Sequence, residues 1–237
     1  MIRLGVTGTD TGVGKTVVTC ALAAALVRRG LNVAAMKPVE TGVAFDDPAR
    51  DGARLVRAAN RSRALAVAAP YVFRHPLAPT VAARREGRQL TVGELDAAVE
   101  QGGRGADALI IEGAGGLLVP VVDRLAFDAL FARWQLDVVI VAANRLGVIN
   151  HTRLTIAAAR AAGLAVGSVV LNQVERQPDG SAAENARVIA DLERVRVVEL
   201  PWLADAGDLD RAADAAERAG LVDLVAATLP VSSAPHR

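Results

Sequence analysis

Nine residues decide the fold: Gly8–Thr16, with the sequence GTDTGVGKT. An apolar run of strand length, Ile2–Thr7, precedes them, and a helical pattern, Thr16–Arg29, follows and ends at Gly30. Glycines in a turn between a strand and a helix allow the backbone N–H groups to surround phosphate oxygens, and the start of the helix favours negative charge. The stretch therefore predicts a phosphate-binding loop.

Two side chains of this loop have predicted roles. Lys15 is placed to reach the β- and γ-phosphates of a nucleotide, and the Thr16 hydroxyl to bind Mg²⁺. The strict pattern has glycine where this chain has Thr9, with Gly8 one residue earlier, so the loop is a variant. The alternative is an ordinary glycine turn, which the Gly-Lys-Thr ending and the strand–loop–helix setting disfavour.

The rest of the chain alternates apolar runs of strand length with longer helical patterns. Apolar residues make up 52% of the chain and aromatic residues only 3%, so Ala, Val, Leu and Ile must fill the core. This profile predicts an α/β fold of three layers, a mostly parallel sheet with helices on both faces. Residues 1–230 are expected to form a single domain, and residues 231–237 a disordered tail. Expected strands are Asn32–Lys37, Ala108–Glu112, Asp137–Ala143, Ala165–Leu171 and Val195–Leu200; expected helices are Asp51–Ala59, Thr91–Gln101, Leu125–Trp134, Asn150–Ala162, Ser181–Glu193 and Arg211–Thr228.

Unusual polar segments follow several of these strands. They are Thr7–Thr16, Lys37–Gly42, Glu112–Gly116 and Asn172. Ligands of parallel α/β sheets bind at the carboxyl ends of the strands, so these segments are expected to converge at one edge of the sheet.

Glu112 and Asp51 are the candidate metal ligands beside Thr16. Glu112 ends a buried strand, where enzymes with a phosphate loop hold a magnesium acid; the alternative is an acid that caps a turn. Asp51 starts a predicted helix, where an acid is more often only a cap.

Lys37 also ends an apolar strand, beside the phosphate loop. A lysine there can neutralise charge on a transferring phosphoryl group, although an isolated strand-end lysine is more often solvated. Thr41 could hold a small polar substrate, and Asn172 could contact a nucleotide base or simply occupy a turn.

Composition disfavours several other classes of protein. The net charge of +1 gives no general attraction to nucleic acid or to an anionic membrane. Cys20 is the single cysteine, so no internal disulfide can form, and no histidine lies at zinc-ligand spacing from a second ligand. The sequence has no Gly-x-Ser-x-Gly motif, signal peptide or membrane-length apolar run. We therefore expect a soluble, cytoplasmic protein without nucleic-acid or membrane partners.

Taken together, the segments resemble the dethiobiotin synthetase family. Thr7–Thr16 is similar to its phosphate loop, Lys37–Gly42 to the segment with its catalytic lysine, and Glu112–Gly116 to its metal and substrate loop. Leu146–His151 is similar to a segment that reaches the substrate carboxylate across a dimer interface. Pro201–Leu203, with Asn172, falls where the family holds adenine, and the resemblance extends in order from residue 2 to about 205.

The resemblance implies a reaction, partners and site residues. ATP would phosphorylate a carbamate made from 7,8-diaminopelargonate and carbon dioxide, and the second amine would close a cyclic urea, the penultimate step of biotin biosynthesis. The enzyme would need Mg²⁺ and would be a homodimer. The implied catalytic residues are Lys15 and Lys37, and the implied metal ligands are Thr16, Asp51 and Glu112. The implied nucleotide contacts are Thr11, Gly12, Val13, Gly14, Lys15, Thr16, Val17, Asn172, Pro201, Trp202 and Leu203. The implied substrate contacts are Lys37, Thr41, Glu112, Gly113, Ala114, Gly115, Gly116, Leu146, Gly147 and Asn150.

The chain departs from the family pattern at Gly12, where several members have a glutamate that contacts the nucleotide. Three alternatives stay open at this point. A partitioning-type switch ATPase has a signature lysine where this chain has Asp10, and a cobyrinate-type amidase has a glutaminase domain for which this chain is too short. A nonenzymatic binding module would not need Lys15, Lys37 and Glu112 at one edge of the sheet.

Overall fold

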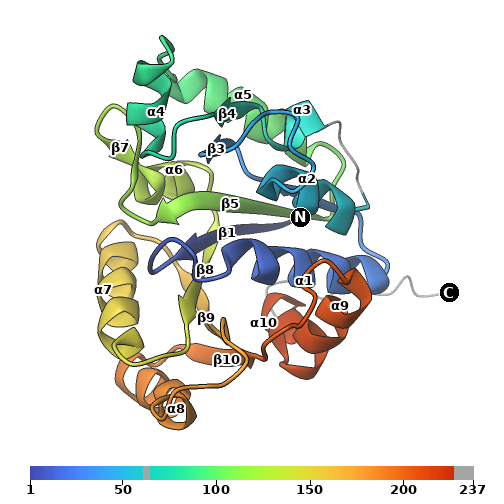
Figure 1. Cartoon of the computed structure of the whole chain (residues 1–237), viewed down its shortest axis with the longest axis vertical. Helices are drawn as coiled ribbons and strands as arrows, with labels where there is room; N and C mark the ends of the chain where they lie inside the picture. The colour runs from blue at the N-terminus through green and yellow to red at the C-terminus, as the bar shows by residue number, and fades with distance from the viewer. Residues whose placement is uncertain (61–64, 227–237) are drawn as a thin grey trace, which may run out of the picture.

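The computed structural model describes residues 1–60 and 65–226, and these contain a six-stranded, all-parallel central sheet (Figure 1). The strand order is β10-β9-β8-β1-β5-β2. The strands are β1 (Ile2–Gly8), β2 (Val33–Met36), β5 (Ala108–Gly116), β8 (Asp137–Ala143), β9 (Val166–Asn172) and β10 (Arg196–Leu200). Two small pairs lie outside this sheet: β3 (Val39–Thr41) runs parallel to β4 (Tyr71–Phe73), and β6 (Pro120–Val122) antiparallel to β7 (Leu125–Ala126).

Helices cover both faces of the sheet. The first face carries α1 (Lys15–Arg28), α2 (Asp51–Ala58), α9 (Leu209–Arg218) and α10 (Leu221–Ala226). The opposite face carries α5 (Val92–Gly103), α6 (Phe127–Arg133), α7 (Val148–Ala161) and α8 (Ala182–Glu193), with α3 (Leu65–Ala68) and α4 (Pro79–Arg85) joining the same apolar cluster. The predicted three-layer α/β fold is confirmed.

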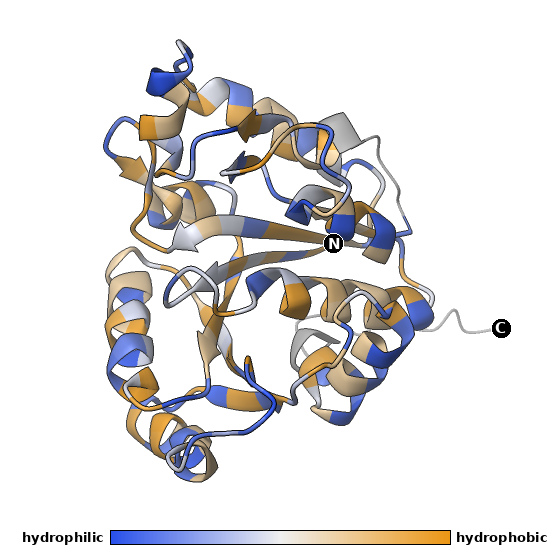
Figure 2. Ribbon diagram, in the orientation of Figure 1, coloured by the Kyte–Doolittle hydropathy of each residue, from blue (hydrophilic) through white to orange (hydrophobic). Residues whose placement is uncertain are grey.

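Strand β8 shows why the core divides into two clusters. Val138, Ile140 and Ala142 belong to the apolar cluster under α5–α8. The alternate residues Val139 and Val141 belong to the cluster under α1 and α9. Successive side chains of a strand point to opposite faces, so an apolar run of this kind needs helices on both sides. Figure 2 shows the result, with hydrophobic colour along the inner strands and hydrophilic colour on the outer sides of the helices.

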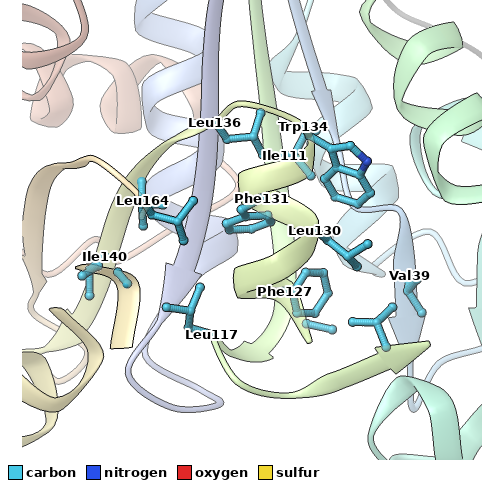
Figure 3. Close-up of a cluster of buried hydrophobic side chains, with 14 of the residues drawn as sticks. Val39, Ile111, Leu117, Phe127, Leu130, Phe131, Trp134, Leu136, Ile140 and Leu164 are labelled. Carbon is cyan, nitrogen blue, oxygen red and sulfur yellow. The ribbon is translucent and has the colours of Figure 1, made fainter. Parts of the chain in front are cut away.

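Three of the seven aromatic residues lie on α6 or at its C-terminal end. Phe131 packs against Phe127 and Trp134 with ring centroids 5.6 and 6.4 Å away, and the three side chains belong to one buried apolar cluster (Figure 3). Gly5 of β1 makes room for them, because a Cβ at that position would lie 2.6 Å from the Phe131 ring. Glycine inside a strand thus permits a close approach of helix and sheet.

Some element predictions were wrong. The single helix expected over residues 211–228 is two helices within its described part, α9 and α10, because Gly220 has φ 73° and ends the first helix in the left-handed conformation. The helix expected from Leu125 begins at Phe127, since Leu125 and Ala126 form β7. Strands β3 and β4 and helices α3 and α4 were not anticipated. The single domain over residues 1–230 stays a prediction, and the predicted tail, 231–237, lies outside the described residues.

Candidate active site

The phosphate loop joins β1, a central strand, to α1. Gly14 is the N-cap of α1 with φ 88°, and no side chain caps this helix. The first N–H groups of α1 are thus left to an external acceptor, which is the usual arrangement at an anion site. Asn172, at the end of β9, donates from Nδ2 to the Val13 carbonyl at 3.0 Å. A Cβ on Gly14 would collide with that amide, so both the left-handed φ and the packing require glycine.

A buried cluster of charges lies beside the loop. Glu112 of β5 has an exposed fraction of 0%, and its Oε1 accepts from Thr16 Oγ1 at 2.8 Å and from Lys37 Nζ at 2.9 Å. Lys37 also donates to Asp51 Oδ2 at 2.5 Å. One ammonium group therefore joins the residue after β2, the middle of β5 and the start of α2. The strand predicted to end at Glu112 in fact continues to Gly116, so Glu112 lies within β5. The second oxygen of Glu112, Oε2, has no hydrogen-bond partner among the described residues.

The two lysines of the site differ electrostatically. Burial by itself lowers the pKa of Lys37, but Glu112 and Asp51 outweigh burial, so the pKa is raised above its ordinary value. Burial likewise opposes ionisation of Asp51, and the ammonium of Lys37 outweighs it and lowers the pKa of that carboxyl. Lys15 donates to the Asp10 carbonyl at 3.0 Å, and burial lowers its pKa. Lys37 is thus held charged by two carboxylates, whereas Lys15 has no carboxylate partner among the described residues.

These groups line one cavity of about 330 Å³. Its walls come from the phosphate loop, the start of α1, the segment after β2, the start of α2 and the end of β5. The lining residues are Thr11, Gly12, Gly14, Lys15, Thr16, Val17, Lys37, Glu40, Thr41, Val43, Asp51, Arg54, Glu112, Ala114 and Gly115. The expected convergence of three strand-end segments at one edge of the sheet is confirmed, and Asn172 from the fourth segment contacts the phosphate loop.

Comparisons with known proteins agree with this geometry. A family profile described as "AAA domain" matches residues 3–208. A protein of Anaeromyxobacter sp. (strain Fw109-5) is 46% identical over 190 residues, covering 80% of this chain and 85% of its own, and is named ATP-dependent dethiobiotin synthetase. Proteins of Aquifex aeolicus and Bacillus subtilis with the same name are 39% and 35% identical; the matches cover 86% and 79% of this chain and 90% and 81% of theirs. The chain belongs to the dethiobiotin synthetase family.

The family assignment confirms the resemblance inferred from the short segments. Among solved structures, a nucleotide-binding protein from Archaeoglobus fulgidus in complex with ADP has a TM-score of 0.49 and 17% identity, with 90% of this chain and 87% of that one covered. Within the described residues, no helix of this synthetase combines the length and apolarity needed to cross a bilayer.

Other predicted contacts of the synthetase lie outside the main cavity. Pro201 and Trp202 line a separate hollow with Asn144, and Leu203 packs against the α1 side of the core. Gly113 lies against Phe127, within the core. The remaining predicted contacts lie elsewhere: Val13 is buried, Gly116 lines a second cavity, and Leu146, Gly147 and Asn150 lie at the start of α7.

Sequence reasoning missed a buried ion pair next to the synthetase site. Arg50 Nη1 donates to Glu40 Oε2 at 2.6 Å, and the two side chains are only 0% and 2% exposed. Glu40 Oε1 also accepts from the Gly52 N–H at 3.1 Å, in the first turn of α2. The pair fixes the start of α2, which carries Asp51. Glu40 lies inside the predicted segment Lys37–Gly42, but no sequence pattern marks Arg50 as buried.

Proposed function

We propose that this enzyme uses ATP to close 7,8-diaminopelargonate and carbon dioxide into dethiobiotin, a cyclic urea, in biotin biosynthesis. The observation that carries the proposal is the cluster of Lys15, Thr16, Lys37, Asp51 and Glu112 in one cavity beside a phosphate loop. Relatives named for ATP-dependent dethiobiotin synthesis support it across most of the chain. They favour a synthetase over a switch ATPase.

The chemistry needs alignment and charge neutralisation rather than a covalent nucleophile. One amine of the substrate adds to carbon dioxide and loses a proton, giving a carbamate. A carbamate oxygen attacks the γ-phosphorus of ATP, and ADP leaves. The second amine then attacks the carbamate carbon, and phosphate leaves as the ring closes. Lys15 and Lys37 are the groups able to offset the charge on the phosphoryl and carbamate oxygens.

The donor set fits Mg²⁺. Carboxylate and hydroxyl oxygens are the ligands that Mg²⁺ prefers, and the free Oε2 of Glu112 is a buried oxygen without a partner among the described residues. Thr16, Asp51 and Glu112 would hold the ion, which supplies charge neutralisation on the nucleotide phosphates when bound. No three His, Cys, Asp or Glu side chains of the described chain form an all-protein metal cage.

A homodimer with the substrate site at its interface is part of the proposal. A second cavity of about 410 Å³ borders Gly8–Asp10 and Gly116 and is lined by Leu118 and Leu154. These leucines are 60% and 62% exposed, and Leu146 nearby in the chain is 83% exposed. Exposed leucines beside a site are the kind of surface that a second subunit buries. Thr41 and the Gly115–Gly116 backbone would position the diamine, and a cytoplasmic location is expected.

The direct test is phosphate release from ATP and Mg²⁺ with bicarbonate, with and without 7,8-diaminopelargonate, together with mass spectrometry of the product. We expect diamine-dependent release and a cyclic urea. Lys37→Ala should keep most nucleotide binding and lose turnover, and normal turnover in that variant would contradict the assigned role. Slow release that ignores the diamine would contradict the substrate and favour the switch ATPase.

The dimer is tested separately, by light scattering during size-exclusion chromatography. We expect the mass of a dimer for the unaltered chain and of a monomer for Leu154→Asp. A monomeric unaltered chain with full turnover would overturn this part of the proposal without touching the chemistry.

A further inference from the structure

The main cavity contains three cations, and one of them has no assigned role. Lys37 is paired with Asp51 and Glu112, and Lys15 belongs to the phosphate loop. The third is Arg54 of α2, which lines the same cavity. The remaining acid of the cavity wall, Glu40, is already engaged by Arg50.

Arg54 is held only weakly by the protein. The guanidinium makes one hydrogen bond within the described residues, from Nη2 to the Ala206 carbonyl at 3.4 Å, and no carboxylate there lies within ion-pair distance of it. A guanidinium carries five N–H donors in a fixed fork that matches phosphate oxygens. Most of the donor capacity of Arg54 is therefore unused in a cavity that already contains a phosphate loop.

The position of Arg54 on its helix relates it to the metal candidate Asp51. The two residues are three apart in α2, so their side chains lie on neighbouring positions of the same helix surface. Thr16 and Val17, at the start of α1, line the same cavity. One turn of α2 thus presents a carboxylate and a cation to this cavity.

We propose that Arg54 is a further phosphate-binding residue of this enzyme, which donates to phosphate oxygens of the bound nucleotide; the inference rests on the proposed use of ATP. It supplements Lys15 and the loop backbone, and it extends the phosphate site from α1 to α2. A nucleotide bound in this way is held by the same helix that carries Asp51, so phosphate binding and the placement of that carboxylate depend on one element.

The test measures binding to the full chain in EDTA without the diamine, by calorimetry with ADP and with inorganic tripolyphosphate. Arg54→Gln should weaken both ligands about 10- to 100-fold, the range for one charge-assisted hydrogen-bonding group. Arg54→Lys should recover part of the loss, because it keeps the charge but not the fork. Arg57→Gln is the matched control: it lies on the same helix, donates to the Pro48 carbonyl and does not line the cavity. We expect it to bind within about twofold of the unaltered chain.

Two results would overturn the inference. Arg54→Gln could bind both ligands as the control does, which would mean that the guanidinium does not contact phosphate. It could instead weaken ADP but not tripolyphosphate, which would mean that Arg54 acts only through the segment around Ala206. Because the assay contains no diamine, its outcome is independent of product formation. An enzyme that makes no cyclic urea can still show the Arg54 effect on binding, and an enzyme that makes the cyclic urea can lack it.

Discussion

The ammonium of Lys37 holds Asp51 and Glu112 together, and replacing Lys37 with methionine measures what this contributes to stability. Methionine keeps the apolar length of the side chain but removes the ammonium that joins Asp51 and Glu112. Glu112 then keeps only the Thr16 hydroxyl as a partner while it remains 0% exposed. Removing one partner of a buried ion pair costs about 3–5 kcal/mol, chiefly from the charge left behind. Asp51 is partly exposed, so water offsets some of its share.

Lys15→Met is the matched control, because it also removes a buried lysine from the same cavity. Lys15 donates only to a backbone carbonyl, and burial already disfavours its charge. A single hydrogen bond of this kind contributes on the order of 1 kcal/mol, and relief of the buried charge offsets it. We therefore expect Lys15→Met to change the free energy of unfolding little.

The assay is thermal unfolding of each variant at one protein concentration, first in EDTA and then with Mg²⁺. For a chain of this size 1 kcal/mol corresponds to roughly 2–4 °C, so Lys37→Met should unfold roughly 6–20 °C below the unaltered chain in EDTA. Mg²⁺ should stabilise Lys37→Met more than the unaltered chain, because the ion no longer competes with the ammonium for the carboxylates. Equal unfolding temperatures in EDTA, or equal shifts with Mg²⁺, would refute this account of the cluster.

Three further predictions concern the Asp51 carboxyl, the buried pair of Glu40 and Arg50, and Gly14 of the phosphate loop. The stability difference between the unaltered chain and Lys37→Met should persist at neutral pH and shrink below about pH 4, as urea unfolding at stepped pH would measure. The lowered pKa of Asp51 stabilises the folded state above the unfolded pKa of about 3.9, and this stabilisation is lost as the pH falls through the folded pKa. Glu40→Gln should cost about 3–5 kcal/mol in urea unfolding, and Arg50→Met added to it should recover part of the loss, because the guanidinium is no longer buried without an anion. Gly14→Ala should abolish detectable ADP binding in calorimetry, because φ 88° and a neighbouring side-chain amide both exclude a Cβ.

The sequence predicted those parts of the fold and site that depend on local pattern and on the geometry of a parallel sheet. The alternation of strand and helix patterns was sufficient to predict a parallel sheet with helices on both faces. The rule that strand ends share one edge was sufficient to predict that Lys15, Lys37 and Glu112 lie together. The boundary of α9 was misjudged because the pattern of apolar residues continues through Gly220, and only the left-handed backbone there ends the helix.

The contacts that the sequence did not predict depend on where α2 lies. Asp51 starts this helix, and a helix-start acid is usually a cap; the structure instead pairs it with Lys37 across the cavity. That placement needs Arg50 to be buried against Glu40, and burial of an arginine is a property of the tertiary structure with no signal in the sequence.

The charged side chains of the site fall into two groups, one already joined in ion pairs and one without carboxylate partners among the described residues. Lys37, Asp51 and Glu112 balance one another, so a metal ion or a carbamate can engage this group only by exchanging partners that are already bonded. Lys15 and Arg54 have no carboxylate partners among the described residues, so an anion adds favourable interactions there without breaking an ion pair. Phosphate binding should therefore precede rearrangement of the Lys37 cluster, and the nucleotide should bind to this enzyme without the diamine more readily than the diamine binds without the nucleotide. Calorimetry with each ligand alone decides this order. If the diamine alone binds more tightly than the nucleotide alone, the ion pairs of Lys37 do not hinder substrate binding and the argument is wrong.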